Sequence, residues 1–140
     1  MNYGIIKLLP KQDKMGGSLT MSEYNLSDVI QHKDFTFALC TFIDEFKRSQ
    51  NKAQMIESPP SAECDSILNL CLLAGLAHKL AVEHELSIPE WVYDSSYRMP
   101  SPYFAYNTQN EEYQAFLLED TPHEFASRNL FIGANAMERV

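Results

Sequence analysis

The stretch from Ile67 to Val82, ILNLCLLAGLAHKLAV, constrains the fold more than any other part of this chain. It has no strand-like alternation, and its apolar side chains fall on several faces of a helix. A helix without a clear polar side usually lies at the centre of its fold. We therefore predict a central helix from Ser61 to His84. Its small residues would let neighbouring helices approach closely: Ala74, Gly75 and Ala77.

A second helix is predicted ahead of this one, beginning at Asp34. Apolar residues recur there at steps of three and four, which places them on one helical face: Phe35, Ala38, Leu39, Phe42, Ile43 and Phe46. The side chain of Asp34 can accept hydrogen bonds from the free amides of the first turn. Met55 and Ile56 would continue this helix until Pro59 and Pro60 break it.

The segment LSIPEWVYD, after the Leu-rich stretch, contains two short-range helix signals. Ser87 and Glu90 have the spacing of a capping box, and Leu86 and Trp91 have that of a hydrophobic staple. We expect a short helical turn with Trp91 against the core. The next stretch, SSYRMPSPYFAYN, holds two prolines and three tyrosines, which predicts a loop or extended chain.

Two capped helix starts are predicted in the last third of the chain. The first is at Thr108, with Glu111 at the capping-box spacing. Its buried face would consist of three residues: Tyr113, Phe116 and Leu117. The second is the clearest local signal in the chain. There Thr121 would cap the helix, Pro122 would take its first position, and Glu124 would reach back.

The final stretch, RNLFIGANAMERV, is too apolar for a solvated tail. Asn129 can adopt the left-handed conformation that ends the preceding helix. We expect NLFI to return the chain to the core, with Phe131 as a packed residue. The last seven residues, ANAMERV, would then form a final helical turn.

Arg128 lies near the negative end of the helix predicted from Pro122, where a cation is stabilising. We interpret it first as an internal brace and second as a partner contact. A forked pair with the carboxylate of Glu119 or Glu124 would be one way to hold it.

The length of 140 residues suits one domain, and no repeat or linker divides the chain. Residues 1–20 lack caps and periodicity, which indicates a flexible N-terminal arm. Met21 is an alternative start. The prediction is an all-α fold in which residues 21–140 form a single small helical domain, with a long central apolar helix and an irregular Pro/Tyr-rich segment.

The net charge of −8 argues against a nucleic-acid binder, because phosphate neutralisation needs clustered Lys and Arg. It argues equally against an anionic membrane surface. No apolar run approaches the roughly 18–20 residues needed to span a bilayer. The charge fits a protein that binds a basic partner, or one that is merely soluble.

Chemical motifs are sparse. The three cysteines, Cys40, Cys64 and Cys71, are an odd number without framework spacing or a signal peptide, which indicates reduced thiols in the cytoplasm. No CxxC, HxH or HExxH occurs, so we expect neither a metal nor a cofactor. A nucleophile elbow and a P-loop are also missing, so we expect a protein that is not an enzyme.

One stretch is distinctive in charge. From Met99 to Ser127 there is no Lys or Arg, while five acids are present among several tyrosines. A negative field with interleaved aromatic rings would suit a docking surface for a basic protein; a solvated rim is the alternative. The candidate partner-binding residues are Tyr103, Tyr106, Glu111, Glu112, Tyr113, Glu119, Asp120 and Glu124.

The motifs SIPEWVYD, TPHEFASRNLFI and ANAMERV resemble the closing part of a poorly characterised bacterial family of small helical domains. Members end in a P-x-W turn and an RN-(I/L)-F-(I/V) element, and stand alone or follow a helix-turn-helix region. Some look like antitoxins or regulators encoded beside nucleotidyltransferase-type toxins. The resemblance covers roughly residues 86–140 and the preceding Leu-rich helix. The N-terminal segment here is too short and too poor in Lys and Arg for a helix-turn-helix, which argues against direct DNA binding.

The functional prediction is a non-enzymatic protein-binding module, antitoxin-like or regulatory, for which a prophage origin would be suitable. The alternative from another class is an acidic inhibitor that mimics nucleic acid, such as a phage anti-defence protein. An unrecognised enzyme comes third. Assembly into a homo-oligomer stays open at this point.

Overall fold

The computed structural model describes residues 25–60 and 66–135. In these ranges the chain forms a single small all-α domain, as predicted. The predicted N-terminal arm lies outside the described residues, as do residues 136–140 of the predicted final turn. The α-helices are α1 (Leu26–Gln31), α2 (Phe35–Arg48), α3 (Lys52–Glu57), α4 (Ile67–Glu83), α5 (Glu111–Asp120) and α6 (His123–Ala126). Between α4 and α5 lie the 3-10 turns η2 (Glu90–Tyr93), η3 (Ser95–Tyr97) and η4 (Ala105–Asn107).

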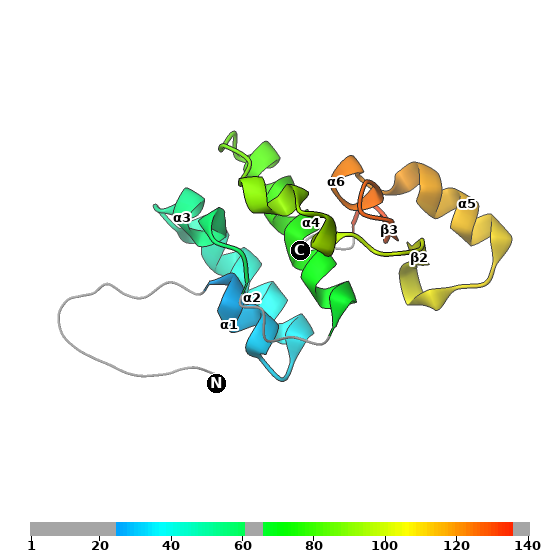
Figure 1. Ribbon diagram of the computed structural model, residues 1–140, viewed down its shortest axis with the longest axis horizontal. Coiled ribbons are helices and arrows are strands. Elements are labelled where there is room, and N and C mark those ends of the chain that lie inside the picture. The colour runs from blue at the N-terminus through cyan, green and yellow to red at the C-terminus, as the bar shows by residue number, and fades with distance from the viewer. Residues whose placement is uncertain (1–24, 61–65, 136–140) are drawn as a thin grey trace.

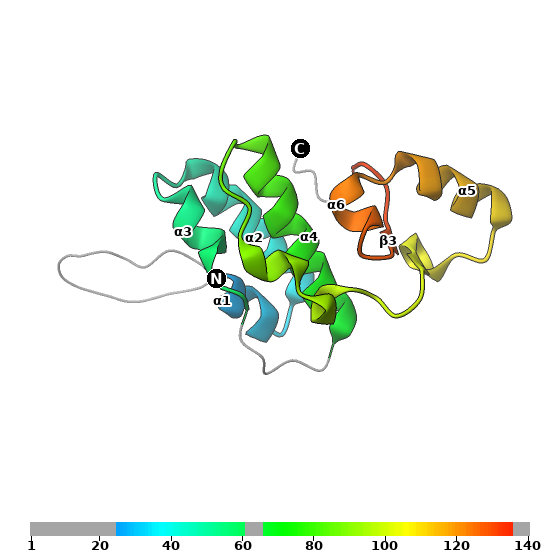
Figure 2. The ribbon, with the colours of Figure 1, turned by 45° about the horizontal axis from the view of Figure 1, so that its top comes forward.

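Helix α4 is central, as its all-round apolar sequence predicts. Figures 1 and 2 show it between α1–α3 on one side and the group formed by α5, α6 and two short strands on the other. Ser66 caps it by accepting a hydrogen bond from the Asn69 amide at 3.1 Å. A Cβ atom on Gly75 would lie 2.5 Å from Cδ1 of Phe125, so this glycine lets α6 come against α4. The predicted close approach at the small residues is confirmed here.

The larger core lies between α4 and α1–α3. Helix α2 buries the predicted face apart from Phe35, which is half-buried, and Asp34 accepts a hydrogen bond from the Phe37 amide at 3.0 Å. The expected continuation of this helix is wrong. Ser49 turns to extended backbone, and its hydroxyl accepts the Asn51 amide at 2.9 Å, so the helix ends at Arg48. Met55 and Ile56 are buried instead by the separate helix α3.

Trp91 lies against this core, as predicted. Its ring packs there half-buried, and its indole N–H donates to the backbone oxygen of Ile56 at 2.9 Å. The predicted capping box is wrong. The turn is a 3-10 helix that begins after Pro89, with no side-chain cap, and Ser87 is exposed. Proline fixes its own φ near −61° and starts the turn by itself, which leaves Ser87 outside it.

A smaller core lies on the opposite side of α4. It is built on Cys71, Phe125 and Leu130, with half-buried apolar residues around them. Strand β2 (Tyr103–Phe104) pairs in parallel with β3 (Leu130–Phe131), so Tyr103 lies opposite Leu130 and Phe104 opposite Phe131. The predicted return of NLFI to the core is thereby confirmed. Leu130 is the fully buried residue, whereas Phe131 is half-buried and stacks on Phe104.

Candidate interaction surface

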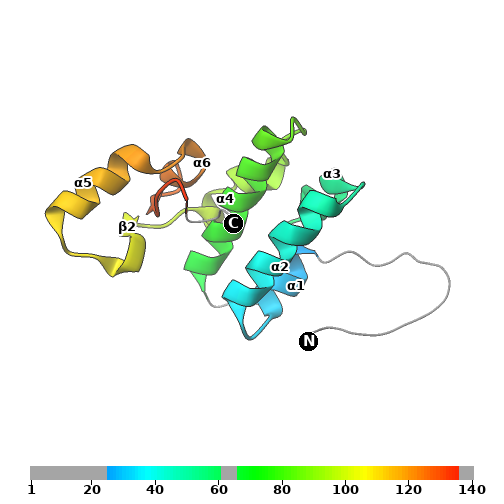
Figure 3. The same cartoon turned by 180° about the vertical axis from the view of Figure 1, so that it is seen from behind.

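Helix α5 is set apart from the bulk of the molecule. Figures 1 and 3 show it on the far side of α4 from α1–α3. Its N-cap is Asn110, whose side chain accepts the Tyr113 amide at 2.8 Å. The predicted cap at Thr108 is wrong, because that hydroxyl accepts the Asn110 amide at 3.1 Å and so shapes the turn before the helix. All ten residues of α5 are described, and Leu117 is the one that is buried.

The outer side of α5 combines acids with large apolar side chains. Phe116 is 55% exposed and Leu118 is 53% exposed. Tyr113, half-buried, stacks on Phe116 with ring centroids 6.2 Å apart and planes 10° apart. We define the α5 surface as the residues Glu111, Glu112, Tyr113, Phe116, Leu118 and Glu119. Phe116 and Leu118 lie on opposite flanks of the helix, about 160° apart around its axis, with the three carboxylates between them. The stacked pair of Tyr113 and Phe116 beside these carboxylates is the part of the surface suited to contact with another macromolecule.

Phe116 was predicted to face the core, and this prediction is wrong. Three consecutive apolar residues, Phe116 to Leu118, span about 200° of a helix circumference. The chain packs against only one side of α5, so only one of the three side chains is covered. The covered residue is Leu117, which lies beside Gly133. The signal was present in the sequence, since three adjacent large apolar residues on a short helix cannot all be buried from one side.

The inner end of α5 is held by the returning C-terminal segment. The Thr121 hydroxyl donates to the Leu117 carbonyl at 2.7 Å and accepts the Gly133 amide at 2.9 Å. The carboxylate of Asp120 accepts the Ala134 amide at 2.8 Å. The predicted cap of α6 by Thr121 is therefore wrong, because its hydroxyl is used between α5 and the chain after β3. Asp120 is used in the same way and does not belong to the outward surface.

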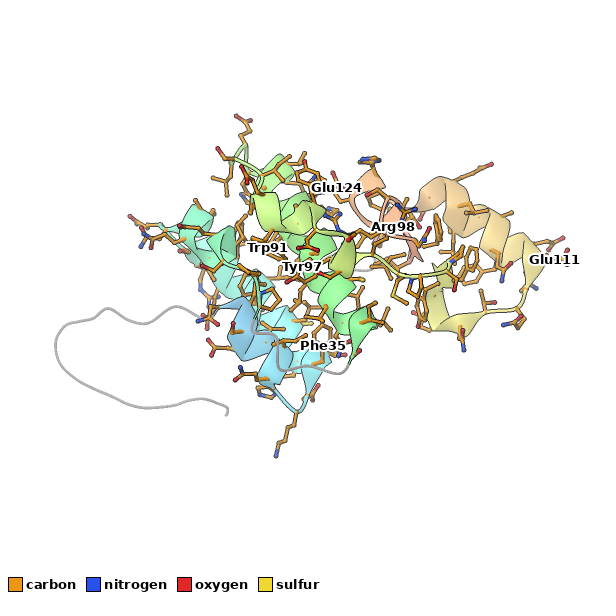
Figure 4. The ribbon with its side chains drawn as sticks, viewed as in Figure 1. Phe35, Trp91, Tyr97, Arg98, Glu111 and Glu124 are labelled. Atoms are coloured by element: carbon orange, nitrogen blue, oxygen red, sulfur yellow. The ribbon has the colours of Figure 1, made fainter. Side chains whose placement is uncertain are left out.

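The eight candidate residues predicted from the sequence do not form one surface. Four of them, Glu111, Glu112, Tyr113 and Glu119, gather on α5. Tyr103 packs half-buried against the smaller core. Tyr106 is 89% exposed on η4, with the unusual positive φ of 59°. Figure 4 shows Glu111 at the outer end of α5 and Glu124 far from it, beside α4.

Arg128 occupies the joint between the two sides of the molecule. It is only 4% exposed. Its Nη1 donates to the Glu124 carbonyl at 2.6 Å and lies 3.2 Å from Nδ1 of His78, and its Nη2 donates to the Val92 carbonyl. The interpretation of Arg128 as an internal brace is confirmed. The brace uses backbone carbonyls, not the forked carboxylate pair that we considered. Among the described residues, none accepts a hydrogen bond from the buried Nε.

The contact with Arg128 determines the protonation state and tautomer of the His78 ring. A guanidinium can only donate, so the Nδ1 of His78 must accept and the ring is neutral with its proton on Nε2. Burial lowers the pKa of His78, and the charge of Arg128 lowers it further. The rings of Tyr93 and His123 lie 5.5 and 6.5 Å from that of His78. These groups join α4, η2 and α6 into one body.

Cys71 lies beneath the same joint and is fully buried. Burial raises the pKa of its thiol to about 11, against the opposing effect of Arg128. A thiol in that state is a poor nucleophile at neutral pH.

Within residues 25–60 and 66–135, no group of three His, Cys, Asp or Glu side chains could hold a metal ion. Across the same residues, no helix has the length and apolar character needed to cross a membrane.

Comparison with protein-family models, with curated proteins and with solved structures gives no match to this chain. The resemblance to a bacterial family of helical domains therefore stays a prediction.

Proposed function

We propose that this protein is a non-enzymatic binding module, antitoxin-like or regulatory, which docks a basic partner protein on the α5 surface. The observation that carries the proposal is the exposure of Phe116 and Leu118, 55% and 53%, on a helix that also presents Glu111, Glu112 and Glu119. Aromatic side chains such as Phe116 are enriched in the cores of protein interfaces, and an exposed apolar side chain such as Leu118 can add buried apolar area beside them. Surrounding carboxylates add selectivity for a partner rich in Lys and Arg.

The apolar anchors favour a protein partner over the nucleic-acid mimic. Proteins that bind nucleic acid recognise mainly the negative charges of the phosphates, so an inhibitor that imitates a phosphate backbone would rely on its carboxylates and not on apolar side chains. The α5 surface instead contains a stacked pair, Tyr113 and Phe116, together with Leu118. We place the interaction in the cytoplasm, in keeping with the free thiols of Cys40 and Cys71.

The test is capture of partners by the purified protein, beginning with the product of the adjacent gene. Two variants address the α5 surface: Phe116→Ser with Leu118→Ser, and Glu111→Lys with Glu112→Lys. The matched control is Glu57→Lys with Glu90→Lys, which makes the same charge change at exposed positions on α3 and η2.

Removal of the two anchors should weaken binding at least about tenfold, since an interface anchor typically contributes more than 1 kcal/mol. The charge variant should slow association, and high salt should remove the difference between it and the wild type. The control should bind normally. If both α5 variants bind as the wild type does at low salt while remaining folded, the partner is held elsewhere and the proposal fails.

A further inference from the structure

Four neighbouring residues on the outer side of α5 can together contact a single side chain of a partner. Positions i, i+3, i+4 and i+7 of a helix adjoin one another on its surface, and a side chain of a packed partner inserts among four such residues. On α5 these positions are Glu112, Ala115, Phe116 and Glu119, which we call the α5 quartet. All four residues are exposed. The quartet combines two carboxylates, an aromatic ring and a methyl group.

We propose that the α5 quartet binds an arginine side chain of the partner protein. The inference rests on the proposed function, because it names the chemical group that the same surface recognises. The guanidinium would lie on the exposed part of the Phe116 ring and pair with the carboxylate of Glu112 or Glu119. The aliphatic stem of the arginine would lie over the methyl group of Ala115, where a larger side chain would obstruct it.

The spacing along the helix brings both carboxylates close to the ring. Glu112 precedes Phe116 by four residues and Glu119 follows it by three, so they lie about 6 Å and about 4.5 Å from it along the helix axis, in opposite directions. Both also lie within about 60° of Phe116 around the axis. A cation on the Phe116 ring therefore has an acid on either side. Leu118 lies on the opposite flank and takes no part.

The Phe116 ring is available for this contact. It stacks on Tyr113 with ring planes 10° apart, yet the residue remains 55% exposed. The face of an aromatic ring carries partial negative charge and attracts a cation that lies over it. The two neighbouring carboxylates add to this attraction, because they carry the same sign of charge as the ring face.

Arginine fits the quartet better than lysine does. The planar guanidinium can stack on a ring and donate two parallel hydrogen bonds to one carboxylate, whereas the lysine ammonium is compact and strongly hydrated. The chain supplies no competing cation nearby in sequence, since residues 99–127 contain no Lys or Arg. Arg128 follows, but it is buried and its Nη atoms donate to backbone carbonyls. A second copy is a poor occupant, because its α5 also lacks Lys and Arg.

The experiment is a titration of the full-length protein with two peptides at low salt, followed by amide chemical shifts in NMR spectra. Both peptides alternate alanine with four cations, which are arginines in one peptide and lysines in the other. Two variants keep the charge of the quartet: Phe116→Leu removes the ring, and Ala115→Leu obstructs the arginine stem. The matched control is Phe37→Leu, because Phe37 is also about half exposed, at 47%, but lies on α2. Leucine favours helix, so each variant should fold, which the same spectra report.

The arginine peptide should bind about two- to fivefold more tightly than the lysine peptide, as is typical of a cation over an exposed ring. The largest shifts should fall on the amides of residues 111–120. Phe116→Leu and Ala115→Leu should each remove the preference for arginine, and Phe37→Leu should keep it. The proposal is overturned by equal affinity for the two peptides, or by a preference that survives either α5 variant or is lost in the control. Shifts centred on another element, or no binding of the arginine peptide at millimolar concentration, would also overturn it.

The role of the carboxylates is tested separately. Glu112→Gln with Glu119→Gln should weaken binding of the arginine peptide several-fold, because the guanidinium loses both charged acceptors. The matched control is Glu57→Gln with Glu90→Gln, which removes the same charge at exposed positions on α3 and η2. An equal effect of the two double variants would mean that only the net charge of the protein attracts the peptide, and the proposal would fail.

Failure of this inference is separable from failure of the proposed function. If the peptides bind equally while the partner protein still requires Phe116 and Leu118, the inference fails and the proposed function stands. If the arginine preference behaves as expected but the partner protein is insensitive to every change on α5, the proposed function fails and the quartet remains an arginine-binding site.

Discussion

Replacement of Arg128 by Met should destabilise this protein more than almost any other single change of a polar residue. The methionine fills much of the volume of the arginine stem but donates no hydrogen bond. Three acceptors lose their donor: the carbonyls of Glu124 and Val92, and the Nδ1 of His78. All three contacts lie where α4, η2 and α6 meet, so their loss weakens the packing of the C-terminal segment against α4.

The magnitude follows from two opposing effects. A buried acceptor left without a donor costs about 1–3 kcal/mol, so the buried Val92 carbonyl and His78 Nδ1 would cost several kcal/mol together, and the part-buried Glu124 carbonyl would add less. The variant also removes the cost of burying a charge, and with it an Nε that has no partner among the described residues. We expect a net loss of about 2–4 kcal/mol, out of the roughly 5–15 kcal/mol typical of a domain.

The assay is urea unfolding followed by circular dichroism, where such a loss lowers the midpoint by about 1–2 M. Arg98→Met is the matched control, because Arg98 is exposed and its loss should change stability by less than about 0.5 kcal/mol. Arg128→Lys should resemble Arg128→Met, since one ammonium cannot donate to three separated acceptors. If Arg128→Met unfolds at the same midpoint as Arg98→Met, or at a higher one, the brace does not stabilise the fold and the reasoning is refuted.

Three further predictions concern stability. The folded state lowers the pKa of His78 from 6.5, so the unfolded state binds the proton more readily. The free energy of unfolding should therefore be highest above pH 6.5 and fall below it. The substitution His78→Gln should reduce the difference between the urea midpoints measured at about pH 7.5 and 5.5. Leu130→Ala should cost about 2–5 kcal/mol in urea unfolding, and more than Phe131→Ala, because Leu130 is fully buried and Phe131 is not; the opposite order would mean that the wrong residue anchors β3. Gly75→Ala should lower the melting temperature at a cost of about 1–3 kcal/mol, because the new methyl group meets the ring of Phe125; an unchanged melting temperature would show that the ring moves aside freely.

The helices α2 and α4 could be predicted because their signals are contiguous in the sequence. The apolar stripe of α2 and the apolar surface of α4 determine which sides must be buried, whatever covers them. Two single-residue signals were equally local. Asp34 caps α2, and Asn129 adopts the positive φ of 63° that ends the turn after α6. In each case the side chain or backbone acts within a few residues of its own position.

The candidate site was only partly predictable. Glu111, Glu112, Tyr113 and Glu119 share α5 because they are close in sequence and one helix carries them. Glu124 belongs to a different helix beside α4, although only four residues separate it from Glu119. Phe116 was assigned to the wrong side, because periodicity cannot tell which of three adjacent apolar residues will be covered.

Tertiary structure decided the features that depend on competition between distant groups. Thr121 has the sequence of a helix cap, yet its hydroxyl is taken by the Leu117 carbonyl and by the Gly133 amide twelve residues away. The pairing of Tyr103 with Leu130 and the contact of His78 with Arg128 join residues 27 and 50 positions apart. Patterns in the sequence specify that a side must be buried or that a polar atom must be satisfied. Only the folded chain selects which atom comes within hydrogen-bonding distance, because several candidates of equal chemistry compete for each partner.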